Sequence, residues 1–313
     1  MIKHLFFSAA LAGVLTTAAC AREDVAQPSS GTAATMAAEP STEAVDFDFP
    51  DSAWRELDPE NTLYIETSGG RIIVEMAPEF APNHVERMRT LAREHFYDFL
   101  VWHRVIDGFM AQGGGSRSAP NHRTDLPNMA AEFTVRRGAD MPVSELQDRV
   151  VNPSNIPQSA KAGFWHSFPV GTQTMALASL TGDGMVNSWL LHCEGAAAMA
   201  RTNDPDSAGS QFYITRGDAE HLNAIYTSWG RVRAGQDAVD AIRVGTLGQD
   251  VGFIPDVINS IRVAADLPED ERTHVQVVDT DAPAFTDYLN SLRDDAGRLP
   301  DVCEITVPTR ILE

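Results

Sequence analysis

The sequence predicts a mainly β protein, an antiparallel β-barrel capped by two helices. Many short β-rich runs recur along the chain, and two segments space their apolar residues as a helix does, a combination that favours a capped barrel over a parallel α/β sheet. Of the 313 residues, 43% are hydrophobic and 22% are charged. These values are typical of a soluble globular protein with a substantial core.

The first predicted strands form a hairpin. Residues 62–67 and 71–76 are β-rich runs, and the Ser-Gly-Gly at 68–70 between them is a turn signal. A helix is predicted to begin near Pro82, because proline suits a first helical turn and apolar residues then recur at helical spacing. Further strands are predicted at residues 101–105, 195–200, 211–215, 228–232 and 256–263, and the second helix at residues 236–243.

The N-terminus has the pattern of an export signal. A basic start and an apolar run at 5–15 precede small residues and Cys20, so residues 1–20 form a predicted signal peptide. Small residues before a cysteine resemble a bacterial lipoprotein processing site, in which Cys20 is acylated and becomes the mature N-terminus. Such sites usually carry leucine where Thr17 stands, so cleaved secretion without acylation stays open. Both alternatives take the protein out of the cytoplasm.

Composition also restricts the partners. Residues 21–50 are rich in Ala, Ser, Thr, Pro and Glu with almost no aliphatic pattern, which predicts a flexible linker. The whole chain has 44 acidic and 24 basic residues, a net charge of -20 that repels nucleic-acid phosphates and anionic membrane surfaces. We expect no nucleic-acid partner, and membrane attachment only through a lipid on Cys20, in the periplasm of a bacterium.

Two further cysteines lie outside the signal. Cys193 and Cys303 could pair in a compartment that permits disulfides, or both could be buried thiols. Adjacent His192 and Cys193 are weak evidence for a metal, because no second pair stands at zinc spacing. No metal site is therefore predicted.

One segment places a charge among apolar residues. It runs Trp102-His-Arg-Val-Ile-Asp-Gly-Phe-Met-Ala-Gln-Gly-Gly-Gly115. On a strand, residues two apart share a face, so Trp102 and Arg104 are expected together and His103 opposite them. An arginine in such a stretch is costly unless it is solvated or satisfied by partners, which indicates a role for Arg104.

This segment resembles the cyclophilin signature, aromatic-His-Arg-aliphatic-aliphatic-x-Gly-Phe-Met-x-Gln-Gly-Gly. Residues 199–214, with a Ser-Gln-Phe-aromatic motif, and residues 222–232 resemble two further blocks of the family, in family order. The resemblance implies a closed eight-stranded antiparallel cyclophilin-like β-barrel over residues 51–266, capped by two helices, with an insertion at about 116–194. Residues 267–313 are expected to be a C-terminal extension packed on this domain, with a strand at 275–278, a helix at 284–294 and a final apolar run at 303–307.

The resemblance also implies the activity, a peptidyl-prolyl cis-trans isomerase with Arg104, Phe109 and Gln112 as catalytic residues. Arg104 would donate to the prolyl nitrogen as the amide twists, and proline-containing polypeptides would be the substrates. Neither a cofactor nor a second copy of the chain is expected. The implied substrate-binding residues are Trp102, His103, Met110, Ala200, Arg201, Thr202, Gln211, Tyr213, His221, Leu222 and Tyr226.

Three of these residues depart from the family pattern. His221 stands where drug-sensitive members have tryptophan, Tyr226 where many have histidine, and Tyr213 where many have phenylalanine. Two other functions are open to the same residues. A noncatalytic proline-binding chaperone module would use the same site for binding alone. An envelope hydrolase would use His103 or His192, but the sequence has neither a Gly-x-Ser-x-Gly nor a His-Glu-x-x-His motif.

Overall fold

The computed structural model describes residues 47–115, 126–151, 160–245 and 254–312. The predicted signal peptide, Cys20 and most of the predicted linker lie outside these ranges. None of the helices in the described ranges has the length and apolar character that a bilayer crossing needs.

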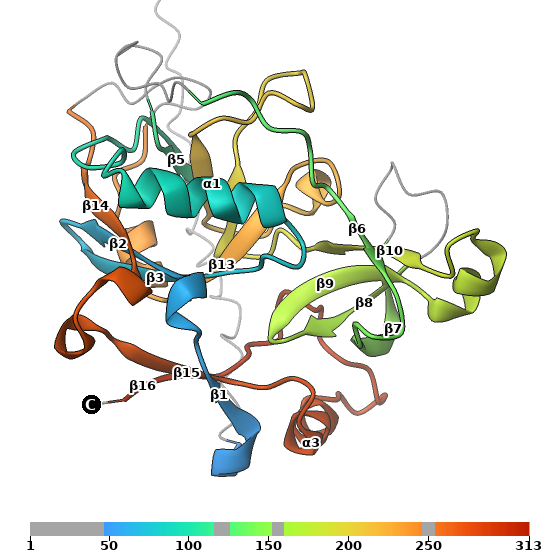
Figure 1. Cartoon of the computed structure of the whole chain (residues 1–313). Helices are drawn as coiled ribbons and strands as arrows, with labels where there is room; N and C mark the ends of the chain where they lie inside the picture. Colours follow the sequence, from blue (N-terminus) through green and yellow to red (C-terminus); the bar gives the residue numbers. More distant parts are fainter. Residues whose placement is uncertain (1–46, 116–125, 152–159, 246–253, 313) are drawn as a thin grey trace, which may run out of the picture. The chain divides into compact units, whose positions relative to one another are not determined.

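The largest sheet contains eight antiparallel strands, as predicted. Its spatial order is β14-β2-β3-β13-β11-β12-β5-β4, and Figure 1 labels β14, β2, β3, β13 and β5 among these strands. The β2–β3 hairpin and β13 begin within one residue of the predicted positions. The strands are β2 Thr62–Thr67, β3 Gly70–Met76, β4 Arg104–Ile106, β5 Met110–Gly113, β11 Ala196–Met199, β12 Phe212–Thr215, β13 Ser228–Ala234 and β14 Ile258–Val263.

The closed barrel predicted from the sequence is not what the sheet forms. Among the described residues, the start of β14 and the segment before β4 meet near one end, at an isolated bridge between Val101 and Val257 and a bond of 2.7 Å from the amide of Ile258 to the carbonyl of Leu100. The amide of Trp102 donates to the carbonyl of Asp256 at 2.9 Å beside this bridge. Because residues 102–103 leave the extended pairing and β4 has only three residues, the sheet is a curled half-barrel.

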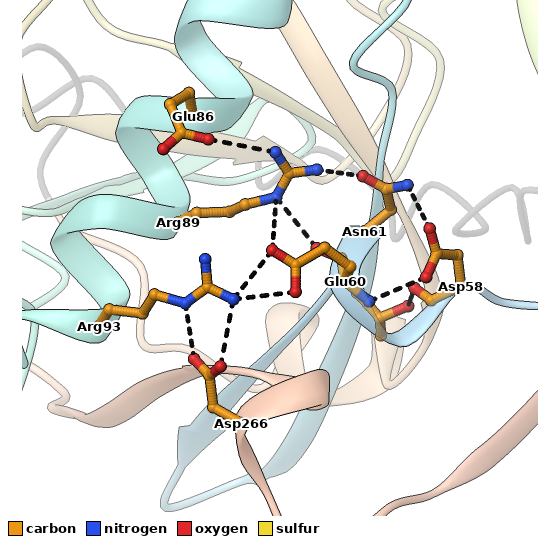
Figure 2. A network of polar contacts seen from close by, with 8 residues as sticks. Asp58, Glu60, Asn61, Glu86, Arg89, Arg93 and Asp266 are labelled. Atoms are coloured by element: carbon orange, nitrogen blue, oxygen red, sulfur yellow. Dashed lines mark hydrogen bonds and ion pairs between the residues drawn. The ribbon is translucent and has the colours of Figure 1, made fainter.

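Both predicted helices of the cyclophilin-like region are present, as α1 Pro82–Arg93 and α2 Gln236–Asp240. The buried face of α1, with Met88 and Leu91, packs into the main core against the curled sheet. At its other face, Arg89 donates to the backbone carbonyl of Glu60, and Arg93 donates to the carboxylates of Glu60 and Asp266 (Figure 2). Such exposed ion pairs contribute at most about 1 kcal/mol each, so the apolar face dominates the packing of α1.

A second sheet of five antiparallel strands lies within the predicted insertion, in the order β6-β10-β9-β8-β7 (Figure 1). These strands were not predicted from the sequence. The β8–β9 turn uses His166 and Ser167 at positive φ, where glycine or asparagine is the usual signal. The strands are β6 Val135–Arg137, β7 Ser144–Val151, β8 Ala160–Trp165, β9 Phe168–Gln173 and β10 Val186–Leu190.

The two ends of the described chain meet in a third sheet, with the order β1-β15-β16. Figure 1 shows β1 (Trp54–Glu56, blue) beside the orange strand β15 (His274–Val278). The predicted helix at 284–294 is α3, Pro283–Ser291. The last strand is β16, Thr309–Leu312, and the expected run at 303–307 lies instead in a turn and irregular backbone.

One core joins segments that are far apart in the sequence. Phe49, Phe164 and Trp189 pack with Phe285 and Leu299, so residues before β1, the second sheet and the C-terminal region share a buried cluster. Val302 and Ile305 point into the same cluster, which explains why this part of the chain turns rather than extends. A disulfide between Cys193 and Cys303 fixes the turn covalently. Short 3-10 helices occur at η1 Asp51–Ala53, η2 Pro59–Asn61, η4 Met175–Leu180, η5 Glu220–Leu222, η6 Ala264–Asp266 and η7 Glu269–Glu271.

Candidate active site

Strand β4 presents Arg104 on the outer side of the curled sheet. The neighbouring Val105 points into the main core, and alternation turns Arg104 the other way. In the β4–β5 register, Arg104 lies opposite Gln112. Its Nη1 donates to Gln112 Oε1 at 3.2 Å and lies 3.8 Å from the sulfur of Met110. The half-buried guanidinium is therefore held in place beside an apolar side chain.

Gln112 connects Arg104 to the next strand of the sheet. Its Nε2 donates to Oε1 of Gln211 at 2.9 Å, so the amide accepts from the arginine and donates to the second glutamine. This chain of polar side chains fixes which way the Gln112 amide faces. Gln211 lies just before β12, and its carbonyl accepts from the amide of Ala200 at 2.9 Å.

Beside the guanidinium lies a small apolar cluster, separate from the main core. We call it the Tyr213 cluster; its buried members are Met110, Ala198, Tyr213, Ala219 and Leu222. Half-buried apolar residues surround it, namely Ile106, Phe109, Ala200 and Tyr226. The structure thus brings together Arg104, Gln112 and seven predicted substrate or catalytic residues from β5, β12, η5 and the loops between them, namely Phe109, Met110, Ala200, Gln211, Tyr213, Leu222 and Tyr226.

Two of the departures from the family pattern contact this cluster. The ring of His221 is exposed and faces Phe109, with 5.5 Å between the ring centroids. Tyr226 meets Tyr213 edge to face at 6.1 Å. The guanidinium of Arg201 lies 4.2 Å from the centroid of the Tyr226 ring, which places a cation over the edge of the cluster.

Three more predicted residues are His103, Arg201 and Thr202. His103 is buried one residue before β4. Arg201 donates to the carbonyl of Ile225 at 2.9 Å, and exposed Thr202 donates its amide to the hydroxyl of Ser207 at 2.9 Å.

The position of Trp102 corrects a prediction made from the sequence. The expected alternation puts it on the face of Arg104, but it is fully buried in the main core. Its ring meets Phe212 edge to face at 5.5 Å, and a Cβ added at Gly113 would lie 3.1 Å from it. The alternation fails because residues 102–103 are not part of strand β4.

His192 and Asn223 form a buried polar support behind Tyr213 that no sequence pattern indicated. Nε2 of His192 lies 3.1 Å from the Tyr213 hydroxyl, and Nδ1 lies 3.3 Å from Oδ1 of Asn223. Burial lowers the pKa of His192 to about 4; the bond to Asn223 opposes this shift, and the nearby His221 adds to it. The ring is therefore neutral at pH 7 and engaged at both nitrogens, which removes it as a free base for a hydrolase.

His192 should make the protein less stable in acid. Its pKa is about 4 in the folded protein and 6.5 for an unperturbed histidine, so the unfolded chain binds more protons between these values. The contribution to stability is complete above pH 6.5 and is lost as pH falls toward 4, amounting to about 2 kcal/mol by pH 5. Urea unfolding at pH 7 and pH 5 should show a weaker pH dependence for His192→Phe than for wild type. Equal pH dependence of the two proteins would contradict a lowered pKa of His192 in the folded state.

Comparison with known proteins identifies the class to which this fold and site belong. The model of the family described as cyclophilin type peptidyl-prolyl cis-trans isomerase/CLD matches residues 62–263. The chain belongs to this family. The match spans the curled sheet, Arg104 and the Tyr213 cluster, and its enzymatic class is peptidyl-prolyl cis-trans isomerase.

Individual relatives agree with the family. A crystal structure of the cyclophilin AquaCyp293 from Hirschia baltica is 35% identical, covers 82% of this chain and 93% of its own, and has a TM-score of 0.72. A probable peptidyl-prolyl cis-trans isomerase of Brucella suis is 31% identical over 211 residues, which are 67% of this chain and 85% of the relative. Peptidyl-prolyl cis-trans isomerase B of Escherichia coli is 28% identical, over 63% of this chain and 96% of the relative.

Proposed function

We propose that the chain accelerates rotation about Xaa-Pro bonds in envelope proteins of a bacterium, and so assists their folding, by electrostatic stabilisation of a twisted amide. The observation that carries the proposal is the position of Arg104. Its fixed guanidinium lies beside Met110 of the Tyr213 cluster, so a charged donor and an apolar surface meet at one place.

The chemistry of the reaction explains why this pairing suits it. Rotation about an amide must overcome about 18 to 20 kcal/mol, because delocalisation of the nitrogen lone pair gives the bond partial double-bond character. A catalyst needs no nucleophile or general base; it needs to bind the twisted amide better than the planar one. A proline ring packed on the Tyr213 cluster would bring the prolyl nitrogen toward Arg104. A guanidinium is permanently charged and presents several donors in fixed geometry.

The location of the protein is part of the proposal. Residues 1–20 have the pattern of an export signal, and Cys20 follows small residues as in a lipoprotein processing site. The Cys193–Cys303 disulfide supports an oxidising compartment, because disulfides are rare in the cytosol of most organisms. Acylated Cys20 would then anchor a monomeric enzyme to a membrane on its periplasmic side.

A protease-coupled assay on a Xaa-Pro peptide tests the activity. The mature chain should increase the rate of cis-trans isomerisation of the peptide above the rate in buffer alone. Equal rates with and without the protein would overturn the proposal. The alternative, a noncatalytic proline-binding chaperone, would protect an unfolding client equally well with Arg104→Ala and would not accelerate the peptide. Incorporation of labelled palmitate into the wild type, but not into Cys20→Ser, would support the lipid anchor; no incorporation into either would leave cleaved secretion.

A further inference from the structure

We infer that His192 is a positioning residue of the isomerase site, which fixes the Tyr213 side chain and the η5 wall of the Tyr213 cluster. The inference rests on the proposed function and adds to it a residue outside the cyclophilin motifs. His192 lies at the end of the region expected to be an insertion, directly before Cys193.

The hydrogen bonds around His192 determine where its proton lies. Its backbone N–H is 2.8 Å from Asn223 Oδ1, and because a backbone N–H only donates, that atom is the amide oxygen. Nδ1 approaches the same oxygen at 3.3 Å, so Nδ1 carries the ring proton. Nε2 is then an acceptor, and the Tyr213 hydroxyl at 3.1 Å donates to it.

The backbone of His192 also contacts the two ends of η5, which supplies another part of the cluster. The carbonyl of His192 accepts from the amide of Ala219 at 2.8 Å, and its amide donates to Asn223. These two contacts bracket η5, which contributes buried Leu222 to the cluster. One residue thus fixes a side chain from β12 and the ends of the η5 segment.

The contact between His192 and Tyr213 is buried, so its loss cannot be compensated by water. His192 is 1% exposed and Tyr213 is 4% exposed, so neither partner can exchange the other for bulk water. If the imidazole is removed, the tyrosine hydroxyl must leave the cluster or stay unsatisfied, and both outcomes disturb the surface that receives a proline ring. No proton moves during amide rotation, so the role is positioning rather than acid-base catalysis.

A double-mutant cycle in the full mature chain tests this inference through kcat and KM. His192→Phe should lower kcat/KM about tenfold, because it leaves the buried hydroxyl without its acceptor. The change should be mainly an increase in KM, since the Tyr213 cluster would contact the substrate's proline ring equally in the planar and the twisted amide. In a Tyr213→Phe background, the same change should have a much smaller effect, because the hydroxyl that needs an acceptor is gone.

A matched control separates positioning from general stability. His84 is also fully buried, with Nδ1 2.6 Å from Glu132, and it lies on α1 and is not a member of the Tyr213 cluster. His84→Phe should lower the unfolding midpoint without changing KM. In addition, long-range ¹H–¹⁵N NMR of the wild type at pH 7 should show His192 protonated at Nδ1 and unprotonated at Nε2.

Three results would overturn the inference: equal effects of His192→Phe in both backgrounds, the same KM change in His84→Phe, or a His192 ring protonated at Nε2. The wild type and Arg104→Ala are measured in the same assay. An inactive wild type would contradict the proposed function itself, whereas an active, Arg104-dependent wild type with an additive cycle would contradict only the role of His192.

Discussion

Replacing Arg104 by alanine should lower kcat/KM for a Xaa-Pro peptide by about 10²- to 10³-fold, the usual cost of removing a preorganised donor from a site of developing charge. In the site, Arg104 Nη1 is held by Gln112 Oε1 at 3.2 Å, so the donor is oriented before substrate arrives. The guanidinium is only half-buried and points away from the main core, so the folded state should tolerate the change. Stopped-flow measurement of the coupled assay gives the ratio.

Two variants make the Arg104 result interpretable. Arg104→Lys keeps the charge but loses the planar fork, and it should recover only part of the activity. Arg298→Ala removes an arginine from the exposed surface near the end of α3, where it pairs with Asp294, and it should leave kcat/KM unchanged. An Arg104→Ala enzyme within threefold of wild type, with an intact circular dichroism spectrum, would remove the guanidinium from the mechanism.

Removal of the disulfide should be the most destabilising change. Cys193 and Cys303 are separated by 110 positions, and the chain-entropy model gives about 4 to 5 kcal/mol for closing a loop of that length. Cys193 is fully buried in the core shared by Phe285 and Leu299, so the bond also holds the C-terminal turn on its packing partners. Guanidinium unfolding of wild type and of the Cys193→Ser, Cys303→Ser double variant measures the difference.

Reducing agent supplies the control for that measurement. It should lower the unfolding midpoint of the wild type to that of the double variant and leave the variant unchanged. If wild type and variant unfold at the same midpoint in oxidising buffer, the two sulfurs are not bonded in solution.

The parts of the fold that could be predicted are those in which local signals agree with the tertiary structure. The β2–β3 hairpin has β-rich runs on both sides of a glycine turn, and it forms where the sequence places it. Helix α2 follows Gly235, whose positive φ of 84° and close approach to the carbonyl of Arg71 leave no room for a side chain. Arg104, Gln112 and Tyr213 could be proposed as site residues because they lie in motifs that resemble a known family, and because a charged residue in an apolar strand suggests a role.

What could not be predicted depends on contacts between distant residues. The β8–β9 turn at His166 and Ser167 has no glycine, so nothing local marks the second sheet. Trp102 breaks the strand alternation, because the adjoining backbone leaves the strand. For His192 the sequence suggested only a weak metal ligand or a hydrolase residue, since its place behind Tyr213 arises only when Asn223 and Tyr213 are brought to its two ring nitrogens.

The pairing of β1 with β15 means that the first strand can pair only late in folding during synthesis or export. Trp54 pairs with Val278. When the chain leaves the ribosome or an export channel with its amino end first, β1 therefore stays unpaired until residues 274–278 have emerged. Contacts across such long loops form slowly. Unpaired strand edges invite intermolecular association, and the three-residue length of β1 offers little template for it during that wait.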